Sequence, residues 1–273
     1  MLMYVLKPIP KDELLKLLDP KAQEVIRYFI KKSLFSQPEP LPEQIDRAVQ
    51  VPKEHIEQWF VQALDVKPIG AGSYPVDIYN EEEGWAADIK MLNAKLNDTG
   101  ELSNDESGEA SLGQKFAGAG VDLDTLFSSK QYETIKDAWL GIFGEKIAQV
   151  ERERNGIKDI IYLFILRAGF NFYLVGCSVE IDNIENVTVG NTTNMSVFLN
   201  NFIAERYGKA KIYKAKKRLE LRLRPKNWVD DNLAVLFETD FQQNHIRLYD
   251  EDLNEDFFQK QFDRINSVKI NII

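Results

Sequence analysis

Two strongly apolar runs limit what this chain can fold into. Residues 159–166 and 170–181 are rich in β-branched and aromatic side chains, and Arg167-Ala168-Gly169 separates them. Strands this apolar need cover on both faces, so we expect them to be the central strands of a sheet. Helical spacing recurs over residues 128–154 and 254–265. The sequence therefore predicts an α/β fold in which a mixed central β-sheet is flanked by helices.

The N-terminal region has its own pattern. Residues 11–35 have helical spacing broken at Asp19-Pro20, which predicts two short helices, and alternate prolines over 38–42 predict an extended connector. We therefore divide the chain into a helical N-terminal arm or cap, residues 1–40, and a main domain, residues 41–273. An arm that serves oligomerisation and a cap on the same core both fit this pattern.

Other elements are predicted from periodicity alone. The expected helices cover residues 41–51, 52–65 and 195–207, and the expected strands cover residues 212–224, 233–241 and 245–249.

Composition indicates the compartment. No apolar run approaches the roughly 18 to 20 residues that span a bilayer, and residues 1–10 lack a basic segment followed by an apolar core. Cys177 is the single cysteine and lies in an apolar run, so we expect it to be buried and exclude a disulfide within the chain. We expect a cytoplasmic protein with no membrane partner.

A hairpin that carries charge is predicted between residues 74–79 and 85–92, because the segment between them is acidic and contains glycine. Strand alternation places Asp88 and Lys90 on one face of the second strand, and apolar side chains on the other face. Asp77 ends a neighbouring strand. We therefore expect Asp77 and Asp88 to lie close together.

The triplet of an acid, any residue and a lysine is not informative by itself. It occurs at 19–21, 65–67 and 88–90. The first precedes a helix break and the second ends a helical pattern, whereas the third lies in an alternating strand after a hairpin with another aspartate. The alternative interpretation of this third triplet is an edge hairpin with solvated charges.

Two carboxylates and an ammonium on one hairpin suit phosphodiester cleavage. Asp77 and Asp88 offer hard oxygen ligands for Mg²⁺ and leave coordination positions for water and phosphate. Lys90 would lie beside the metal, where it could orient the attacking water and balance charge on the phosphorane.

These residues resemble the PD-(D/E)xK nuclease superfamily, most closely type II restriction endonucleases. Pro75-Val76-Asp77 corresponds to the first half of the motif and Asp88-Ile89-Lys90 to the second. One departure is that Val76 separates the proline from the aspartate. The resemblance implies a restriction-endonuclease-like core, which covers about residues 52–181.

The resemblance also implies roles for particular residues. Asp77, Asp88 and Lys90 would be catalytic, and Asp77, Asp88 and Ile89 would hold the metal. A helix before the hairpin in this superfamily often lends a third acid, and Glu57 is the better candidate of two because it borders the apolar face of its helix.

A DNA-binding surface is predicted despite a net charge of −9. Residues 209–226 concentrate basic side chains, whereas acidic residues gather in 81–83, 101–109 and 250–256. The basic residues assigned to DNA binding are Lys211, Lys214, Lys216, Lys217, Arg218, Arg222 and Arg224. An exposed strand face whose charges prevent edge pairing is the alternative.

Residues 93–127 form a polar, glycine-rich stretch that is too long for an ordinary connection. We expect a loop inserted after the catalytic strand. Asn104, Ser107, Gln114 and Lys115 carry hydrogen-bonding groups that could read base edges. Composition does not distinguish a recognition loop from a passive one.

The expected activity is therefore Mg²⁺-dependent, sequence-specific cleavage of double-stranded DNA by a homodimer, because a symmetric site needs one active centre per strand. A DNA methyltransferase encoded nearby would protect the host genome. Structure-specific nucleases, modification-dependent nucleases and an inert DNA-binding or scaffold protein of the same fold are the alternatives.

Overall fold

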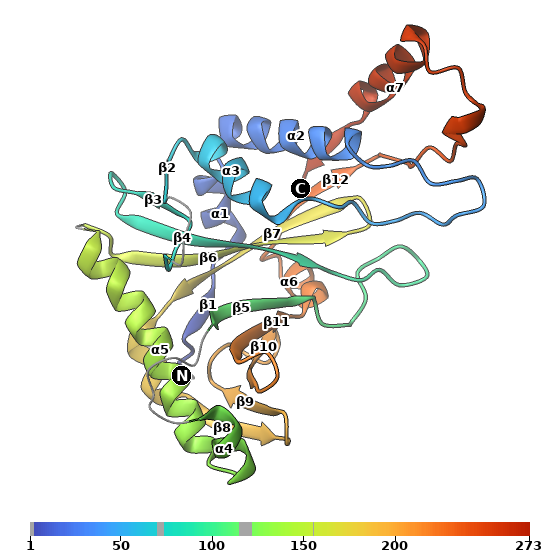
Figure 1. Ribbon diagram of the computed structural model, residues 1–273. Coiled ribbons are helices and arrows are strands. Elements are labelled where there is room, and N and C mark those ends of the chain that lie inside the picture. The colour runs from blue at the N-terminus through green and yellow to red at the C-terminus, as the bar shows by residue number, and fades with distance from the viewer. Residues whose placement is uncertain (1–2, 70–73, 115–121, 155) are drawn as a thin grey trace.

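The computed structural model describes residues 3–69, 74–114, 122–154 and 156–273 (Figure 1). The strands of its central sheet are β1 (Leu6–Pro8), β2 (Lys67–Pro68), β3 (Ile78–Asn80), β4 (Trp85–Asn93), β6 (Asp159–Ala168), β7 (Asn171–Val179), β12 (Val235–Thr239) and β13 (Ile270–Ile272). They follow the order β13-β12-β7-β6-β4-β3-β2, and β1 pairs with β7. The two apolar runs are thus central strands, and the predicted α/β fold is confirmed.

Helices cover one face of this sheet (Figure 1). They are α1 (Lys11–Leu17), α2 (Pro20–Phe35) and α3 (Lys53–Leu64). Helix α2 begins where the Asp19 side chain accepts a hydrogen bond from the Ala22 amide at 2.7 Å, as a helix cap should. Its buried residues Ala22, Ile26, Ile30 and Leu34 recur every fourth position, so one stripe packs inward. The two helices expected in this region are confirmed.

The opposite face of the sheet is covered by α5 (Tyr132–Glu153) and by a second sheet (Figure 1). The strands of the second sheet are β5 (Glu109–Gln114), β8 (Thr188–Thr192), β9 (Ser196–Asn200), β10 (Gly208–Tyr213) and β11 (Arg218–Leu223), in the order β5-β11-β10-β9-β8. Helix α5 buries Ile135, Phe143 and Ile147 between the sheets. Each such side chain stabilises the fold by roughly 1.5–3 kcal/mol.

Helix α5 also connects β4 to β6, which pair in parallel. Parallel neighbours need such a crossover, because a short turn cannot return the chain to the same end of the sheet. The register places Asp88 beside Tyr162 and Lys90 beside Phe164. The crossover therefore lays α5 over the face of β4 that carries Asp88.

The predicted hairpin is confirmed, since β3 and β4 pair antiparallel with Ile78 opposite Ala87. Alternation along β4 is also as expected. Ala86 and Leu92 pack into the core shared with α5 and the second sheet, whereas Ala87 and Ile89 pack into the core beneath α2 and α3.

Several predicted elements are wrong. Residues 41–51 contain no helix, and residues 195–207 contain strand β9 instead of a helix. Residues 212–224 are not one strand but the end of β10, a turn and β11. Residues 245–249 contain no strand. Short alternating segments gain strand structure only through their partners, which periodicity does not reveal.

The segment expected as a long loop, residues 93–127, is also different. It contains β5, which pairs with β11, and helix α4 (Leu123–Ser128). Ser107 is buried, and its hydroxyl accepts a hydrogen bond from the Leu223 amide at 3.0 Å, so Ser107 is not free to read bases.

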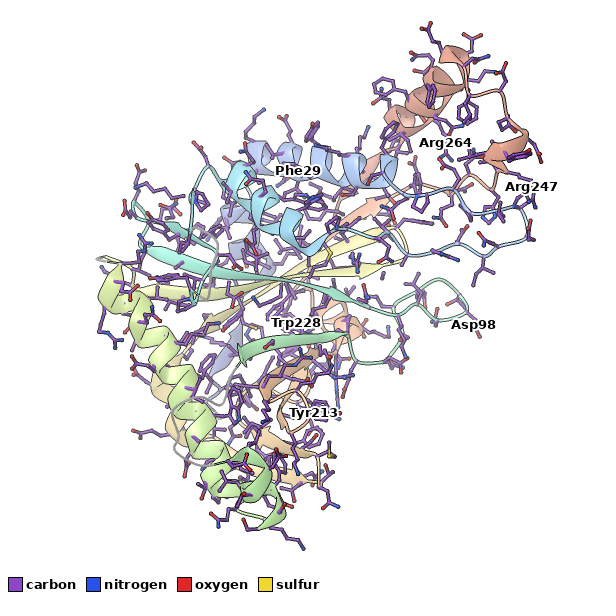
Figure 2. The ribbon with its side chains drawn as sticks, viewed as in Figure 1. Phe29, Asp98, Tyr213, Trp228, Arg247 and Arg264 are labelled. Atoms are coloured by element: carbon purple, nitrogen blue, oxygen red, sulfur yellow. The ribbon has the colours of Figure 1, made fainter. Side chains whose placement is uncertain are left out.

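The remaining elements complete the molecule. They are α6 (Pro225–Asp230), α7 (Glu255–Ser267), and the 3₁₀ helices η1 (Ile181–Asn186) and η2 (Leu248–Asp250). Helix α7 projects from the body, and Arg264 and Arg247 lie in this region (Figure 2). Cys177 is buried, as expected. Within the described ranges, no helix combines the length and apolar character that crossing a membrane requires.

Gly84 lies at the end of the hairpin turn, and a substitution there tests whether the turn requires a glycine. Its φ is +76°, and a Cβ there would lie 2.8 Å from the Gly156 carbonyl oxygen. We expect Gly84→Ala to lower the free energy of unfolding by about 1–3 kcal/mol, measured by urea denaturation. Gly141→Ala is the control, because its Cβ would meet nothing within 4 Å, and we expect it to be neutral or stabilising. Equal midpoints for the two variants would contradict the assigned strain.

Candidate active site

Asp88 lies at the centre of the candidate site. It projects from β4 toward α5 and is 3% exposed. Its Oδ1 accepts a hydrogen bond from Lys90 Nζ, and its Oδ2 accepts one from Lys146 Nζ at 3.0 Å. A buried carboxylate is stable only with such partners, because an unpaired charge at this depth is strongly disfavoured.

Lys146 is a site residue that was not predicted from the sequence. Its ammonium lies within donor distance of three acceptors, Asp88 Oδ2, the Tyr162 hydroxyl at 3.3 Å and the Leu112 carbonyl oxygen at 3.3 Å. An ammonium has three N–H groups, so all three have an acceptor. These contacts connect α5 to β4, β6 and β5. No motif spacing indicates Lys146, because only the crossover places it over Asp88.

Asp77 lies directly before β3. Its amide donates to the Ala87 carbonyl oxygen at 2.8 Å, and its Oδ2 accepts from the Ile89 amide at 2.7 Å. Since Ile78 is opposite Ala87, the same register places Asp77 opposite Asp88. The hairpin thus brings together the three predicted residues Asp77, Asp88 and Lys90.

The two carboxylates differ in protonation. Burial and the charge of Asp88 raise the pKa of Asp77 to about 7. Burial also acts to raise the pKa of Asp88, but the charges of Lys146 and Lys90 outweigh it and leave this pKa below its ordinary value. Asp88 is therefore the permanent anion of the pair, and Asp77 titrates near neutral pH.

These residues line a cleft of about 850 Å³ between the two sheets. Asp77, Asp88, Lys90 and Lys146 lie in it together with Glu57 of α3. Glu57 is exposed, and its charge contributes to the raised pKa of Asp77. The cleft thus contains every residue that the sequence assigned to catalysis.

The donors in the cleft suit a hard cation. In the part of the chain that the structure describes, no three His, Cys, Asp or Glu side chains gather in a metal-binding group. Mg²⁺ does not require one, because it is commonly held by one or two carboxylates together with water and phosphate. The pKa of Asp77 is raised first by burial and then by repulsion from the Asp88 carboxylate, and a cation would relieve this repulsion. The Ile89 backbone lies beside them.

The other two acid-x-lysine triplets have structural roles. Asp19 caps α2. Asp65 follows the end of α3 as its C-terminal cap, in a left-handed conformation, and Lys67 pairs with Glu81 at 2.6 Å on the surface. Of the three triplets, the one at 88–90 lines the cleft described above.

The basic residues assigned to DNA are already engaged. Seven of them share four acids in the described part of the chain: Lys211 contacts Glu220, Lys214 and Lys217 contact Asp124, Lys216 and Arg222 contact Glu109, Arg218 contacts Glu109 and Glu220, and Arg224 contacts Glu205. The expected separation of acidic from basic segments is wrong, because β5 brings Glu109 onto the basic strands. Bases still outnumber their acids on this face.

The residues predicted to read bases differ in their distance from the basic residues and in whether the structure describes them. Asn104 is exposed and lines a polar hollow with Arg222 and Arg224. Gln114 ends β5, and Lys115 lies outside the described residues. Asn104 is therefore brought near two residues of the basic set.

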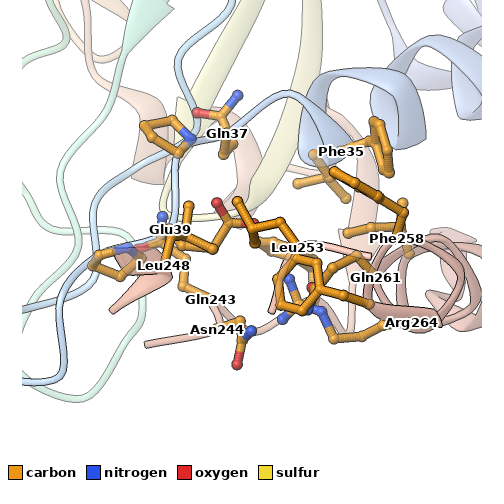
Figure 3. Close-up of a pocket in the computed structure, with 16 residues that line it drawn as sticks. Phe35, Gln37, Glu39, Gln243, Asn244, Leu248, Leu253, Phe258, Gln261 and Arg264 are labelled. Atoms are coloured by element: carbon orange, nitrogen blue, oxygen red, sulfur yellow. The ribbon is translucent and has the colours of Figure 1, made fainter. Parts of the chain in front are cut away.

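A second hollow, of about 190 Å³, lies between α7 and segments near residues 34–40 and 241–253 (Figure 3). Its walls include Phe35, Leu248, Leu253 and Phe258, and Glu39 is the one carboxylate among the described lining residues. It has no arrangement comparable to the paired aspartates and lysines.

Comparisons with known proteins give no relative. No protein-family model matches this chain, and neither a curated protein nor a solved structure matches it. The assignment of function therefore depends on the site.

Asp77 makes the stability of the protein depend on pH. Its pKa is about 7 in the folded state against an ordinary 3.8. Between these values the folded protein holds a proton that the unfolded chain lacks, so the free energy of unfolding contributed by Asp77 falls as pH rises. We expect Asp77→Asn to lessen this fall, measured by urea denaturation in EDTA at both ends of the range. An identical pH dependence in the two proteins would contradict the raised pKa.

Lys146→Met tests the buried ion pair. Removing one partner leaves Asp88 with a single cation, and we expect a loss of roughly 3–5 kcal/mol in the free energy of unfolding. Lys136→Met on the same helix is the control, because Lys136 pairs with the exposed acids Glu133 and Asp137 and we expect a loss below about 1 kcal/mol. Adding Asp88→Asn should recover part of the loss in Lys146→Met. Equal losses in the free energy of unfolding at both lysines would show that the pair between Lys146 and Asp88 stabilises the fold no more than the pairs of Lys136 with exposed acids do.

Proposed function

We propose that this protein is a Mg²⁺-dependent endonuclease that hydrolyses phosphodiester bonds in double-stranded DNA, as a type II restriction enzyme does. The observation that carries this proposal is the convergence of Asp77, Asp88 and Lys90 in one cleft, on the hairpin that resembles the PD-(D/E)xK motif. A solvated edge hairpin would not bury Asp88 between two lysines. The resemblance in sequence and the placement in space are separate reasons for the same assignment.

The chain supplies distinct groups for this chemistry. Asp77, Asp88 and the backbone at Ile89 would hold Mg²⁺. Bound there, the ion would polarise the phosphate and lower the pKa of a water molecule. Lys90 offers an ammonium that balances the charge developing on the phosphorane and orients the attacking water. Lys146 keeps the Asp88 carboxylate ionised and fixed in direction.

The remaining residues extend this assignment. Glu57 places a third carboxylate at the cleft. Arg218 lines the cleft and belongs to the basic face, which provides a path for the DNA backbone, and Asn104 lies in the adjoining polar hollow. Lys115 remains a proposed contact on sequence grounds alone.

The biological setting follows from the activity. We propose a cytoplasmic homodimer, because a duplex site with two-fold symmetry is cut on both strands by two copies. A DNA methyltransferase encoded nearby would protect the genome from cleavage.

Cleavage of supercoiled plasmid with Mg²⁺ tests the proposal. We expect Lys90→Ala to slow cleavage by roughly 10²- to 10³-fold and Asp88→Asn to abolish it, while DNA binding in Ca²⁺ persists in both. The matched control is the double variant Asp65→Asn, Lys67→Ala, which alters the same triplet outside the cleft and should cut at the unmodified rate. Unchanged cleavage by both site variants would remove the hairpin from the active site.

The products distinguish the kinds of nuclease. Discrete fragments indicate sequence specificity, and a smear indicates a nonspecific nuclease. Branched and methylated substrates test structure-specific and modification-dependent cleavage. An absence of cleavage on all of these substrates would favour an inert DNA-binding or scaffold protein.

A further inference from the structure

Three cations converge on a single carboxylate at the start of β5. Arg218 Nη2 lies 2.5 Å from Glu109 Oε1, and Arg222 Nη2 lies 3.1 Å from Oε2. Lys216 Nζ also contacts Oε1. Strand pairing creates this cluster, because Glu109 lies opposite Arg222 in the register of β5 and β11.

The cluster borders the candidate active site. Glu109 and Arg218 line the same cleft as Asp88 and Lys90. Arg222 lines the polar hollow that contains Asn104. The three cations therefore lie where a strand leaving the active site would pass onto the second sheet, the sheet that also carries Tyr213 (Figure 2).

The two arginines have N–H donors that Glu109 does not accept from. Arg222 Nε is buried and has no hydrogen-bond partner among the described residues. Arg218 divides its guanidinium between Glu109 and the fully buried Glu220, which lies at 2.7 Å from Nε. Guanidinium forks bind phosphate in the same paired geometry as carboxylate, and a phosphate offers more acceptor oxygens.

We propose that Lys216, Arg218 and Arg222 form a binding site for a phosphate group of a nucleic-acid backbone, and that Glu109 occupies this site until nucleic acid displaces it. Glu109 is then an internal mimic of the ligand that lowers affinity for nucleic acid. The proposal rests on the proposed function for the nature of the ligand. The cluster itself is independent of metal binding and cleavage.

Glu109→Gln tests this site by removing the competing charge at constant shape. We measure the anisotropy of a fluorescent DNA duplex in EDTA over a series of salt concentrations. We expect binding to tighten about tenfold and the slope of log K against log salt to steepen by roughly 0.9, because one more phosphate is neutralised. Adding Arg222→Gln should cancel both changes.

Glu106→Gln is the matched control. Glu106 lies on the same segment and lines the polar hollow with Arg222, but it pairs with Lys209 at 3.2 Å and does not contact the three-cation cluster. We expect a smaller change in affinity from this variant. Thermal unfolding of each variant checks that it remains folded, and if Glu109→Gln does not fold, Arg222→Gln alone should weaken binding and flatten the slope.

The outcomes separate this proposal from the nuclease assignment. If Glu109→Gln is folded and binds duplex with unchanged affinity and slope, the phosphate site is wrong and the nuclease assignment stands. Inorganic phosphate, titrated by calorimetry, is the second arm. Binding of phosphate but not duplex by Glu109→Gln would support an anion site and overturn its assignment to nucleic acid. If Glu109→Gln binds neither phosphate nor duplex, both the anion site and its assignment to nucleic acid are overturned.

Discussion

The contact between Asp88 and Lys146 is the constraint on which the site depends. Asp88 is 3% exposed, and Lys146 reaches it at 3.0 Å from a helix 58 residues further along the chain. An unpaired charge at this depth would destabilise the fold by several kcal/mol, so α5 is held in register over β4. The same ammonium contacts the Leu112 carbonyl oxygen of β5. The Lys146 ammonium thus connects the helix, the central sheet and the second sheet around the cleft, and it keeps Asp88 ionised.

Local patterns were enough to predict the central strands, the hairpin and three residues of the site. Alternation along β4 determines which side chains share a face, and the turn before Trp85 determines that Asp77 lies opposite Asp88. Lys146 could not be found in this way. Along α5 it is one polar position among many, like Lys136, and the two side chains are similarly exposed. Only the crossover from β4 to β6 gives Lys146 a buried partner in Asp88, whereas Lys136 pairs with exposed acids.

The errors have the same physical origin. Residues 109–114 form a strand because β11 offers an edge about a hundred residues further along the chain, which no local window contains. Residues 196–200 form a strand because they pair with both sequence neighbours, β8 and β10, although their own spacing resembles that of a helix. The pairing of β5 with β11 also explains the misjudged charge distribution. Acids that are about a hundred residues from the basic stretch in sequence become its direct neighbours, as Glu109 and Arg222 do at a sequence separation of 113. Separation along the chain therefore says little about separation of charge in space.

A basic face whose cations are already paired has consequences for binding. A polyanion that approaches it exchanges one set of ion pairs for another, so the net gain per contact is smaller than for free lysines. Seven bases share four acids here, so under the proposed function a surplus of positive charge would remain for the polyanion. The chain carries a net charge of −9, so its other surfaces repel DNA. Attraction confined to one face and repulsion elsewhere would direct a duplex to the side of the molecule where Asp77, Asp88 and Lys90 open into the cleft.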